Sequence, residues 1–453
     1  MKIIALLLLT LLVSCSTSVI KKKQGTNSFI LSNVNIVDVE NQTIIPSKTI
    51  IIKNGKIDSI TDKSSPLTNQ QLEIIDGKSG FITPGLIDMH VHMYEKAAYI
   101  LTLSHGVTHV RIMNGVPKHL TWRDNIAAGK QVGSTSTVSS PIISGYKEAY
   151  LHHGVETAKE ARAAVKEYHM KGYDLIKAYG NLNEVALSAI VNEGKNLGIP
   201  IAKHGPHATG DMAVSQLKGF QSFEHIEDIY QGPLNYKFAP EKLPGIAKTL
   251  KATNVPITPT LNIFYQLTKL SLEKEAYLAK TSKHYTSDII ATETSSNQVK
   301  RWLKSSEKMA THNQKTLKFL QHITKVFHEH GIPLMVGSDS GVLLSPHGLA
   351  THNEMRLLKK AGLSTFDILA AATITPAKAL NLDKQIGEIS VNYNADFIYS
   401  STNPTLNLSV LKTPEAVIKN GHWYSRDTLN AMRDEAIDSR SFWEEFFLLL
   451  EAL

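Results

Sequence analysis

The chain has 453 residues, of which 42% are hydrophobic and 20% are charged. This balance is typical of a soluble globular protein with a large core, and the length accommodates a full barrel plus a smaller module. The net charge is +7, but the lysines are scattered and only residues 21–23 form a basic run. The composition therefore argues against nucleic acid as a partner.

The N-terminus carries an apolar run at residues 3–13, preceded by Lys2. This run is too short to remain as a bilayer-spanning helix but suits the core of a signal peptide. It ends in Leu-Val-Ser-Cys15, which resembles the lipobox of bacterial lipoproteins, and Cys15 is the only cysteine of the chain. We expect a signal peptide at 1–15, a polar tether at 16–26 and a lipid on Cys15 that anchors the exported protein to a bacterial membrane, facing the periplasm or the cell exterior. The alternative is a cleaved signal peptide with an incidental cysteine.

Both ends of the remaining chain show the alternation of β-strands. Residues 28–60 alternate around an Asn54-Gly55 turn, and a second such region near the C-terminus contains Asn420-Gly421. We expect residues 27–80 and 383–430 to form one small β-sandwich; two unrelated hairpins are the alternative.

The middle of the chain, residues 81–382, alternates short apolar strands with helical stretches, one of which ends at Gly198. The predicted strands are 81–92, 107–113, 137–144, 173–179, 199–204, 221–226, 255–260 and 332–339. Eight strands over this length predict an α/β fold, a closed (β/α)₈ TIM barrel. An open doubly wound sheet would need a glycine-rich phosphate loop after the first strand, and none is present.

Two further segments are expected to be helical. Residues 265–325 are charged, helix-prone and too long for an ordinary connection, which predicts inserted helices near the barrel mouth. Residues 431–453 predict a C-terminal amphipathic helix, whose aromatic face is expected to pack on the body or on a second subunit of a homo-oligomer. That face comprises Phe442, Trp443, Phe446 and Phe447.

Metal-ligating residue types occupy the carboxyl ends of several predicted strands, where barrel enzymes place their chemistry. These residues are His90, His92, Lys177, His204, His225 and Asp339. Because residues i and i+2 of a strand share a face, His90 and His92 can hold one ion together. A single histidine at a strand end would mean little, but their joint occurrence predicts a metal site.

The same positions lie in longer stretches that resemble the amidohydrolase superfamily. The first is FITPGLIDMHVH at 81–92, and the agreement continues through DLIKAYG, HIED, VGSDSG and the segment from HNEM to GEISVNYNADFIY. Within the superfamily, the chain is most similar to the imidazolonepropionase-related branch, which includes enzymes similar to Xaa-Pro and other carboxyl-end dipeptidases. The resemblance implies a (β/α)₈ barrel with a β-sandwich built from both termini.

The resemblance also implies a role for each matching residue. His90 and His92 would hold the more buried of two divalent metal ions, expected to be Zn²⁺, and His204 and His225 the second. Lys177, carboxylated by CO₂, would bridge them as a carbamate, because an ammonium group beside two cations is disfavoured relative to the amine that reacts with CO₂. Asp339 would bind the first metal and take the proton from the bridging water. A mononuclear site with an ion-paired Lys177 is the alternative.

Five other residues are candidates for substrate contacts. Tyr179 is a candidate donor to a carbonyl or carboxylate, and His152 and His153 either face the substrate or lie on a solvated loop. Arg111 either pairs with a substrate carboxylate or forms a structural ion pair. His207 competes with His204, which we prefer because it directly ends its predicted strand.

The leading hypothesis is hydrolysis of an amide bond in a small molecule, a dipeptide or N-acyl amino acid, by a metal-bridging hydroxide. One alternative is a cyclic amide or lactone hydrolase, or a deaminase, on the same site. The alternative from another class is a surface lipoprotein that binds a ligand without catalysis.

Overall fold

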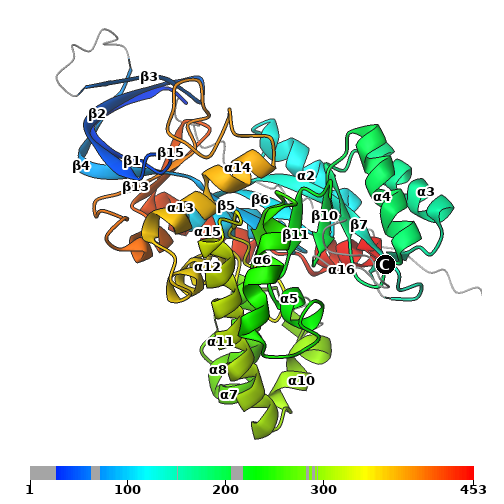
Figure 1. The fold of residues 1–453 in the computed structure, drawn as a ribbon. Helices are drawn as coiled ribbons and strands as arrows, with labels where there is room; N and C mark the ends of the chain where they lie inside the picture. The colour runs from blue at the N-terminus through cyan, green and yellow to red at the C-terminus, as the bar shows by residue number, and fades with distance from the viewer. Residues whose placement is uncertain are drawn as a thin grey trace, which may run out of the picture.

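The computed structural model describes residues 27–62, 72–149, 151–205, 218–281, 285–287, 291–292 and 294–452. The expected signal peptide, the tether and Cys15 lie outside the described residues, as does His207. The described part of the chain forms two sheets and the helices around them (Figure 1).

The first sheet is mixed and contains seven strands in the order β15-β14-β13-β4-β1-β2-β3. Its strands are β1 (Phe29–Asp38), β2 (Thr43–Lys53), β3 (Lys56–Asp62), β4 (Ile74–Pro84), β13 (Phe397–Ser400), β14 (Ala416–Lys419) and β15 (His422–Ser425). Both predicted Asn-Gly turns close hairpins, with positive φ at Asn54 and Gly55 and again at Asn420 and Gly421. The prediction that both ends of the chain build one small β module is therefore confirmed.

The second sheet is parallel and runs in the order β12-β11-β10-β9-β7-β6-β5, with β8 paired to β7. Its strands are β5 (Leu86–Val91), β6 (Val107–Ile112), β7 (Thr135–Ser144), β8 (His152–Gly154), β9 (Leu175–Ala178), β10 (Ile201–His204), β11 (Ser222–Glu224) and β12 (Ile257–Thr258). Residues 332–339, the eighth predicted strand, join its two edges. The Met335 amide donates to the Ile257 carbonyl, and the Met89 amide donates to the Val336 carbonyl, each over 2.9 Å. The predicted TIM-barrel fold is confirmed.

The predicted first strand at 81–92 is wrong in one respect, because the structure divides it at Gly85. Residues up to Pro84 belong to β4 in the mixed sheet, and β5 starts the barrel at Leu86. A Cβ atom on Gly85 would lie 2.1 Å from the Thr108 hydroxyl oxygen, so only glycine fits where the chain crosses between the sheets. Hydrophobicity alone does not reveal this crossing, since both strands are apolar.

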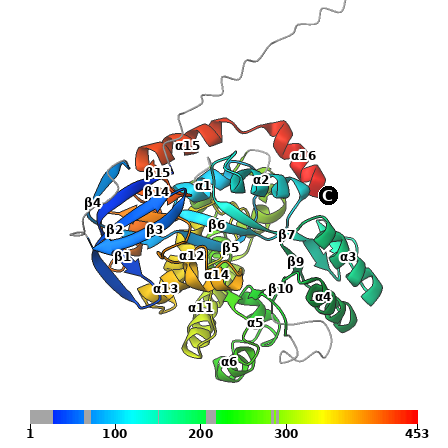
Figure 2. The same cartoon turned by 90° about the horizontal axis from the view of Figure 1, so that it is seen from above.

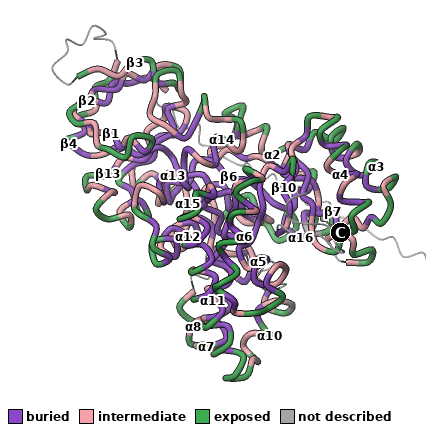
Figure 3. The backbone as a smooth tube through the Cα atoms, in the orientation of Figure 1, coloured by how far each residue is buried: buried purple, intermediate pink, exposed green. Residues whose placement is uncertain are grey.

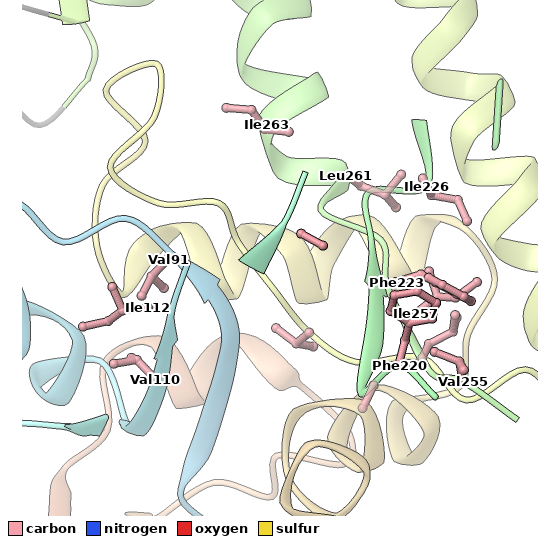
Figure 4. Packing of buried hydrophobic residues seen from close by; sticks show 14 of the residues in the cluster. Val91, Val110, Ile112, Phe220, Phe223, Ile226, Val255, Ile257, Leu261 and Ile263 are labelled. Carbon is pink, nitrogen blue, oxygen red and sulfur yellow. The ribbon is translucent and has the colours of Figure 1, made fainter. Parts of the chain in front are cut away.

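The barrel core is built from side chains of the parallel strands and of the helices packed outside them. The buried stretches of these elements are purple in Figure 3. Val91, Val110 and Ile112 gather on neighbouring strands β5 and β6, and Phe223 and Ile257 pack together on β11 and β12 (Figure 4). All five are at most 1% exposed, and burying such a side chain fully contributes about 1.5–3 kcal/mol. This packing holds the strand ends, and the polar residues on them, in fixed positions.

Helices cover the outside of the barrel (Figures 1 and 2). They are α1 (Ala98–Ser104), α2 (Pro117–Ala127), α3 (Ala158–Met170), α4 (Glu184–Leu197), α5 (Glu227–Gln231), η2 (Pro240–Lys242), α6 (Leu243–Lys251), α12 (Leu349–Lys360), α13 (Thr365–Ala372), α14 (Ile374–Ala379), η5 (Leu408–Lys412) and α15 (Arg426–Asp438). As predicted, α4 stops before Gly198, which has a φ of 69°.

The long segment before the last barrel strand is helical in its described residues and projects away from the barrel (Figure 1). Its elements are α7 (Leu261–Glu273), α8 (Glu275–Leu278), η4 (Ser295–Val299), α10 (Lys300–Leu303) and α11 (Glu307–Glu329). The base of α7 supplies Ile263 and Leu267 to the wall of the cavity described below. The segment therefore contributes to the site as well as extending from it.

The C-terminal segment forms two helices rather than one, α15 and α16 (Phe442–Ala452), which follow one edge of the molecule (Figure 2). Of the two packings expected for the aromatic face of α16, the body is excluded for Phe442, Trp443 and Phe447, which are 58%, 64% and 57% exposed. Packing on a second subunit stays a prediction. Leu448 instead faces inward and is buried. Among the described helices, none combines the length and apolarity needed to cross a bilayer.

Candidate metal centre

Two histidines mark the carboxyl end of β5. His90 lies in the strand and His92 directly follows it, and their ring centroids are 5.3 Å apart. The predicted i, i+2 arrangement thus brings both imidazoles to the same place. His90 is 1% exposed, whereas His92 lies nearer the opening with 13% exposure.

Asp339 reaches the same point from the segment that closes the barrel. Its Oδ1 lies 3.0 Å from His92 Nε2 and 3.7 Å from His90 Nε2, and its Oδ2 lies 4.0 Å from His225 Nδ1. His90, His225 and Asp339 each offer one ligand atom within 4.8 Å of the others. A group this compact can hold a metal ion.

His204 ends β10 and His225 follows β11, so neighbouring strands present them side by side. Their ring centroids are 4.3 Å apart, and the Tyr179 ring lies 4.0 Å from that of His204. The backbone of His225 has a φ of 68° and that of Asp339 a φ of 52°, in the left-handed region that costs a non-glycine residue about 1–3 kcal/mol. Packing of the strand ends maintains this strain, which aims both side chains into the site.

Lys177 lies in β9, which pairs with β10, the strand of His204, and it is 1% exposed. Its Nζ has no hydrogen-bond partner among the described residues. Burial lowers the pKa of Lys177 to about 8. An amine with such a pKa is neutral in about one molecule in ten at pH 7, far more often than an ordinary lysine, and the neutral amine is the form that reacts with CO₂.

Several buried polar atoms of the site are left without a hydrogen-bond partner in the described structure. They are Lys177 Nζ, His204 Nδ1, Asp228 Oδ2 and Asp339 Oδ1. Buried polar atoms are normally satisfied, so a cluster of orphaned donors and acceptors around one point indicates a missing charged ligand. The residues present therefore fit one or more divalent cations.

The protonation states also suit metal binding, which requires neutral imidazoles and an ionised carboxylate. Burial lowers the pKa of His90 to about 4 and places those of His204 and His225 well below their usual value. Burial opposes ionisation of Asp339, but contact with His90, His92 and His225 outweighs it and keeps the pKa of this carboxyl low.

The orientation of His90 is set by a buried ion pair behind it. His90 Nδ1 lies 2.8 Å from Glu224 Oε2, and the other oxygen of Glu224 accepts a hydrogen bond from Arg111 Nη2 over 2.5 Å. Arg111 also donates to the Met89 carbonyl and to the Ser222 hydroxyl, and it is completely buried. The prediction that Arg111 contacts the substrate is thus corrected to its alternative, a structural ion pair.

All six predicted metal ligands line one cavity of about 450 Å³ at the barrel mouth. A larger cavity of about 730 Å³ lies between α15, α16 and the mixed sheet, and is lined by the ion pair of buried Glu95 and partly buried Arg440. None of the six residues lines that larger cavity, although Tyr94 borders both. Another cavity, of about 790 Å³, is also larger and is likewise lined by none of the six. The candidate site is therefore identified by its ligand-type side chains and not by its volume.

The other predicted contact residues divide between the cavity and its surroundings. Tyr179 and His152 line the cavity, with ring centroids 4.9 Å apart. His153 is on the opposite side of β8, where its Nδ1 lies 2.7 Å from the Tyr168 hydroxyl of α3, so the expectation that it faces the substrate is wrong. Both histidines belong to a short strand rather than to a solvated loop.

A model of the amidohydrolase family matches residues 81–424. The chain belongs to this family. The resemblance predicted from the sequence is confirmed.

Curated relatives of this amidohydrolase match over parts of their length. This chain is 25% identical over 264 residues to dihydroorotase of Elusimicrobium minutum (strain Pei191), and the match covers 50% of this chain and 59% of that protein. It is 35% identical over 66 residues to imidazolonepropionase of Idiomarina loihiensis (strain ATCC BAA-735 / DSM 15497 / L2-TR), covering 14% and 16% of the two chains. The amidohydrolase thus spans less than two thirds of either relative.

Solved structures resemble this amidohydrolase over most of its length. Bottromycin amidohydrolase superposes with a TM-score of 0.75 and 19% identity, covering 92% of this chain and 91% of the other. A Xaa-Pro dipeptidase with bound methionine superposes with a TM-score of 0.67 and 18% identity, covering 88% and 100%. At these identities the likeness supports the fold.

Three acidic residues of the amidohydrolase site escaped the sequence analysis: Glu224, Glu227 and Asp228. All three flank His225 in the stretch FEHIED, so an unusual density of carboxylates beside a candidate ligand was the available signal. Asp228 Oδ2 lies 3.4 Å from His204 Nε2, while Glu227 lines the cavity. Burial, reinforced by Asp228 and Asp339, raises the pKa of Glu227 to about 8.

Proposed function

We propose that this chain is a metal-dependent hydrolase that cleaves an amide bond in a small substrate, a dipeptide or an N-acyl amino acid. The observation that carries the proposal is the convergence of six ligand-type side chains on one cavity, with buried polar atoms that lack partners among the described residues. Membership of the amidohydrolase family and the fold likeness to a Xaa-Pro dipeptidase support it.

In this proposal the site holds two divalent ions, expected to be Zn²⁺. His90, His92 and Asp339 would hold one ion, His204 and His225 the other, and Lys177 would contact both after conversion to a carbamate. When bound, such ions acidify a water molecule and polarise the scissile carbonyl. Nitrogen and carboxylate ligands of this kind suit zinc.

The remaining steps belong to side chains of the protein. Asp339 is ionised and directs an orphaned oxygen into the cavity, so it can accept the proton released by the attacking water. Burial raises the pKa of the Tyr179 hydroxyl, which keeps it protonated and able to donate a hydrogen bond to the substrate. Ile142, Ile263 and Leu267 form apolar parts of the wall and limit the access of bulk water.

The names of the curated relatives favour one alternative within the same chemistry. Dihydroorotate and the substrate implied by the name imidazolonepropionase are ring compounds, so opening of a cyclic amide is the second candidate. The same acidified water and carbonyl polarisation would serve this reaction.

The proposal is tested by metal analysis of the purified protein together with a product assay over dipeptides, N-acyl amino acids, cyclic imides and lactones. We expect at least one equivalent of zinc and release of free amino acids. His90→Asn is expected to lose metal and activity, and His322→Asn, at an exposed position of α11, to retain both. Activity on ring substrates alone would replace the dipeptidase assignment. Well under one equivalent, with no activity restored by added zinc, would favour a ligand-binding protein.

We also propose that the protein is exported and held at a membrane by a lipid on Cys15. Support comes from the apolar run at residues 3–13 and the Leu-Val-Ser-Cys ending described above. Its test is given in the Discussion.

A further inference from the structure

The aromatic face of α16 is largely exposed and continuous along the helix. Its members lie at helical spacing, and exposed Leu450 extends the same stripe. The ring centroids of Phe442 and Phe446 are 6.1 Å apart. Those of Trp443 and Phe447 are 6.3 Å apart. A contiguous apolar stripe of this kind on a surface is typical of a site that binds another protein or a membrane.

The opposite side of α16 is fixed to the body of the molecule. Glu445 and Leu448 are buried there. Arg440, just before the helix, donates to Oε1 of buried Glu95, in the loop after β5, over 3.1 Å. Turning the aromatic face inward would break this ion pair and expose Leu448. The face therefore needs a partner outside the described fold.

The beginning of the described chain lies next to α16. Phe29, the first residue of β1, lines the cavity of about 730 Å³ between α15, α16 and the mixed sheet. Glu444 and Leu448 of α16 line the same cavity. The chain that follows Cys15 thus enters the fold at the edge of the molecule along which α15 and α16 run (Figure 2).

The length of the preceding segment limits the distance between this edge and a lipid on Cys15. Residues 16–26 separate Cys15 from Asn27. Even fully extended, this segment spans at most about 40 Å. A compact chain of this size measures about 60 Å across. Anchoring through Cys15 would therefore keep the edge that carries α16 close to the membrane.

We propose that the aromatic face of α16 docks on the phospholipid membrane to which Cys15 anchors the chain, with the helix parallel to the membrane surface. Phenylalanine and tryptophan side chains favour the boundary between lipid headgroups and acyl chains. Since a few side chains alone bind a membrane weakly, the lipid retains the protein and the face fixes its orientation. The inference goes beyond the proposed hydrolysis and uses the proposed lipid on Cys15.

The test supplies the lipid chemically. Because Cys15 is the only cysteine, a protein of residues 15–453 can be coupled through it to maleimide-bearing phosphatidylethanolamine in phosphatidylcholine vesicles. Brominated phosphatidylcholine quenches the fluorescence of tryptophan that contacts lipid, so Trp443 reports on the face. We expect brominated vesicles to quench the wild type and Trp443→Phe to lose this quenching. Trp302→Phe, in α10 of the projecting segment, is the matched control and is expected to keep it.

A second variant keeps the reporter and weakens the face. Phe442→Ser/Phe447→Ser retains Trp443 and changes only exposed positions, so it is expected to fold. Burying one aromatic side chain changes a partition constant about tenfold or more, so the ratio of docked to undocked protein should fall about 100-fold and the quenching should disappear. Absence of quenching in the wild type, or quenching that survives in this variant or in Trp443→Phe, would overturn the inference.

Light scattering of the uncoupled protein separates a membrane from a second copy of the chain. We expect the wild type and Phe442→Ser/Phe447→Ser to have the same oligomeric state in solution. A dimer that this variant dissociates, with no quenching of the coupled wild type, would assign the face to a second copy and refute the inference. Because the lipid is supplied by coupling and no turnover is measured, failure here leaves the natural lipid on Cys15 and the hydrolase assignment to their own tests.

Discussion

Replacing Glu224 by glutamine is expected to weaken metal binding about 10- to 100-fold, because Glu224 orients a proposed ligand. Its Oε2 lies 2.8 Å from His90 Nδ1, so the opposite ring nitrogen, Nε2, is directed toward Asp339. Glutamine keeps the shape of the side chain but removes its negative charge. His90 is then held less firmly, and the buried guanidinium of Arg111 loses its counterion.

The same substitution is expected to reduce stability. Glu224 and Arg111 are both completely buried, and removing one partner of such a pair costs about 3–5 kcal/mol. The glutamine carbonyl can still accept from Arg111 Nη2, which places the expected loss at the lower end of this range.

The assays are urea denaturation of the metal-free protein and zinc titration against a competing chelator. Glu167→Gln is the matched control, because Glu167 forms an exposed pair with Lys171 that is expected to contribute less than about 1 kcal/mol. The double variant Arg111→Met/Glu224→Met is expected to recover stability without recovering metal affinity. If Glu224→Gln loses stability while its zinc affinity equals that of the wild type, Glu224 does not act through His90 and the reasoning is refuted.

Three further predictions concern Lys177, Glu354 and Cys15. Lys177→Ala is expected to lose at least one equivalent of zinc, with partial recovery of activity in formate or acetate, whose carboxylate can occupy the vacated space; unchanged zinc content would contradict the bridging assignment. Burial raises the pKa of Glu354 to about 8, so the folded wild type is progressively destabilised as pH rises from about 4.5 through about 8. Glu354→Gln lacks this effect, so its free energy of unfolding should rise by a few kcal/mol relative to that of the wild type between pH 5 and pH 9. Urea denaturation of the metal-free protein measures this difference, and a difference that does not change with pH would contradict the prediction. Cys15→Ser is expected to move the protein from the membrane fraction to the soluble fraction, and retention of the variant at the membrane would reject the lipid anchor.

The fold was predictable because its signals are local. Strand ends carrying His90, His204 and His225 were identified from short apolar runs, and Asn54-Gly55 marked its hairpin directly. The crossing at Gly85 was missed, since the steric conflict that requires glycine there arises with Thr108 on another strand.

The surroundings of the site were less predictable because they depend on contacts between distant residues. Arg111 meets Glu224 across 113 positions of sequence, and no local pattern distinguishes that pair from a substrate-binding arginine. His152 and His153 could have been separated by strand alternation, had β8 been identified as a strand. The position of Glu227 required the folded chain, since only the structure shows that this residue lines the cavity.

The proposed function requires metal ions at the barrel mouth. Anomalous X-ray scattering from zinc-loaded crystals, recorded at the zinc absorption edge, tests this directly. We expect two peaks in the 450 Å³ cavity, one contacted by His90, His92 and Asp339 and the other by His204 and His225, with Lys177 bearing extra density. Absence of any peak in that cavity, or zinc bound only elsewhere on the protein, would contradict it.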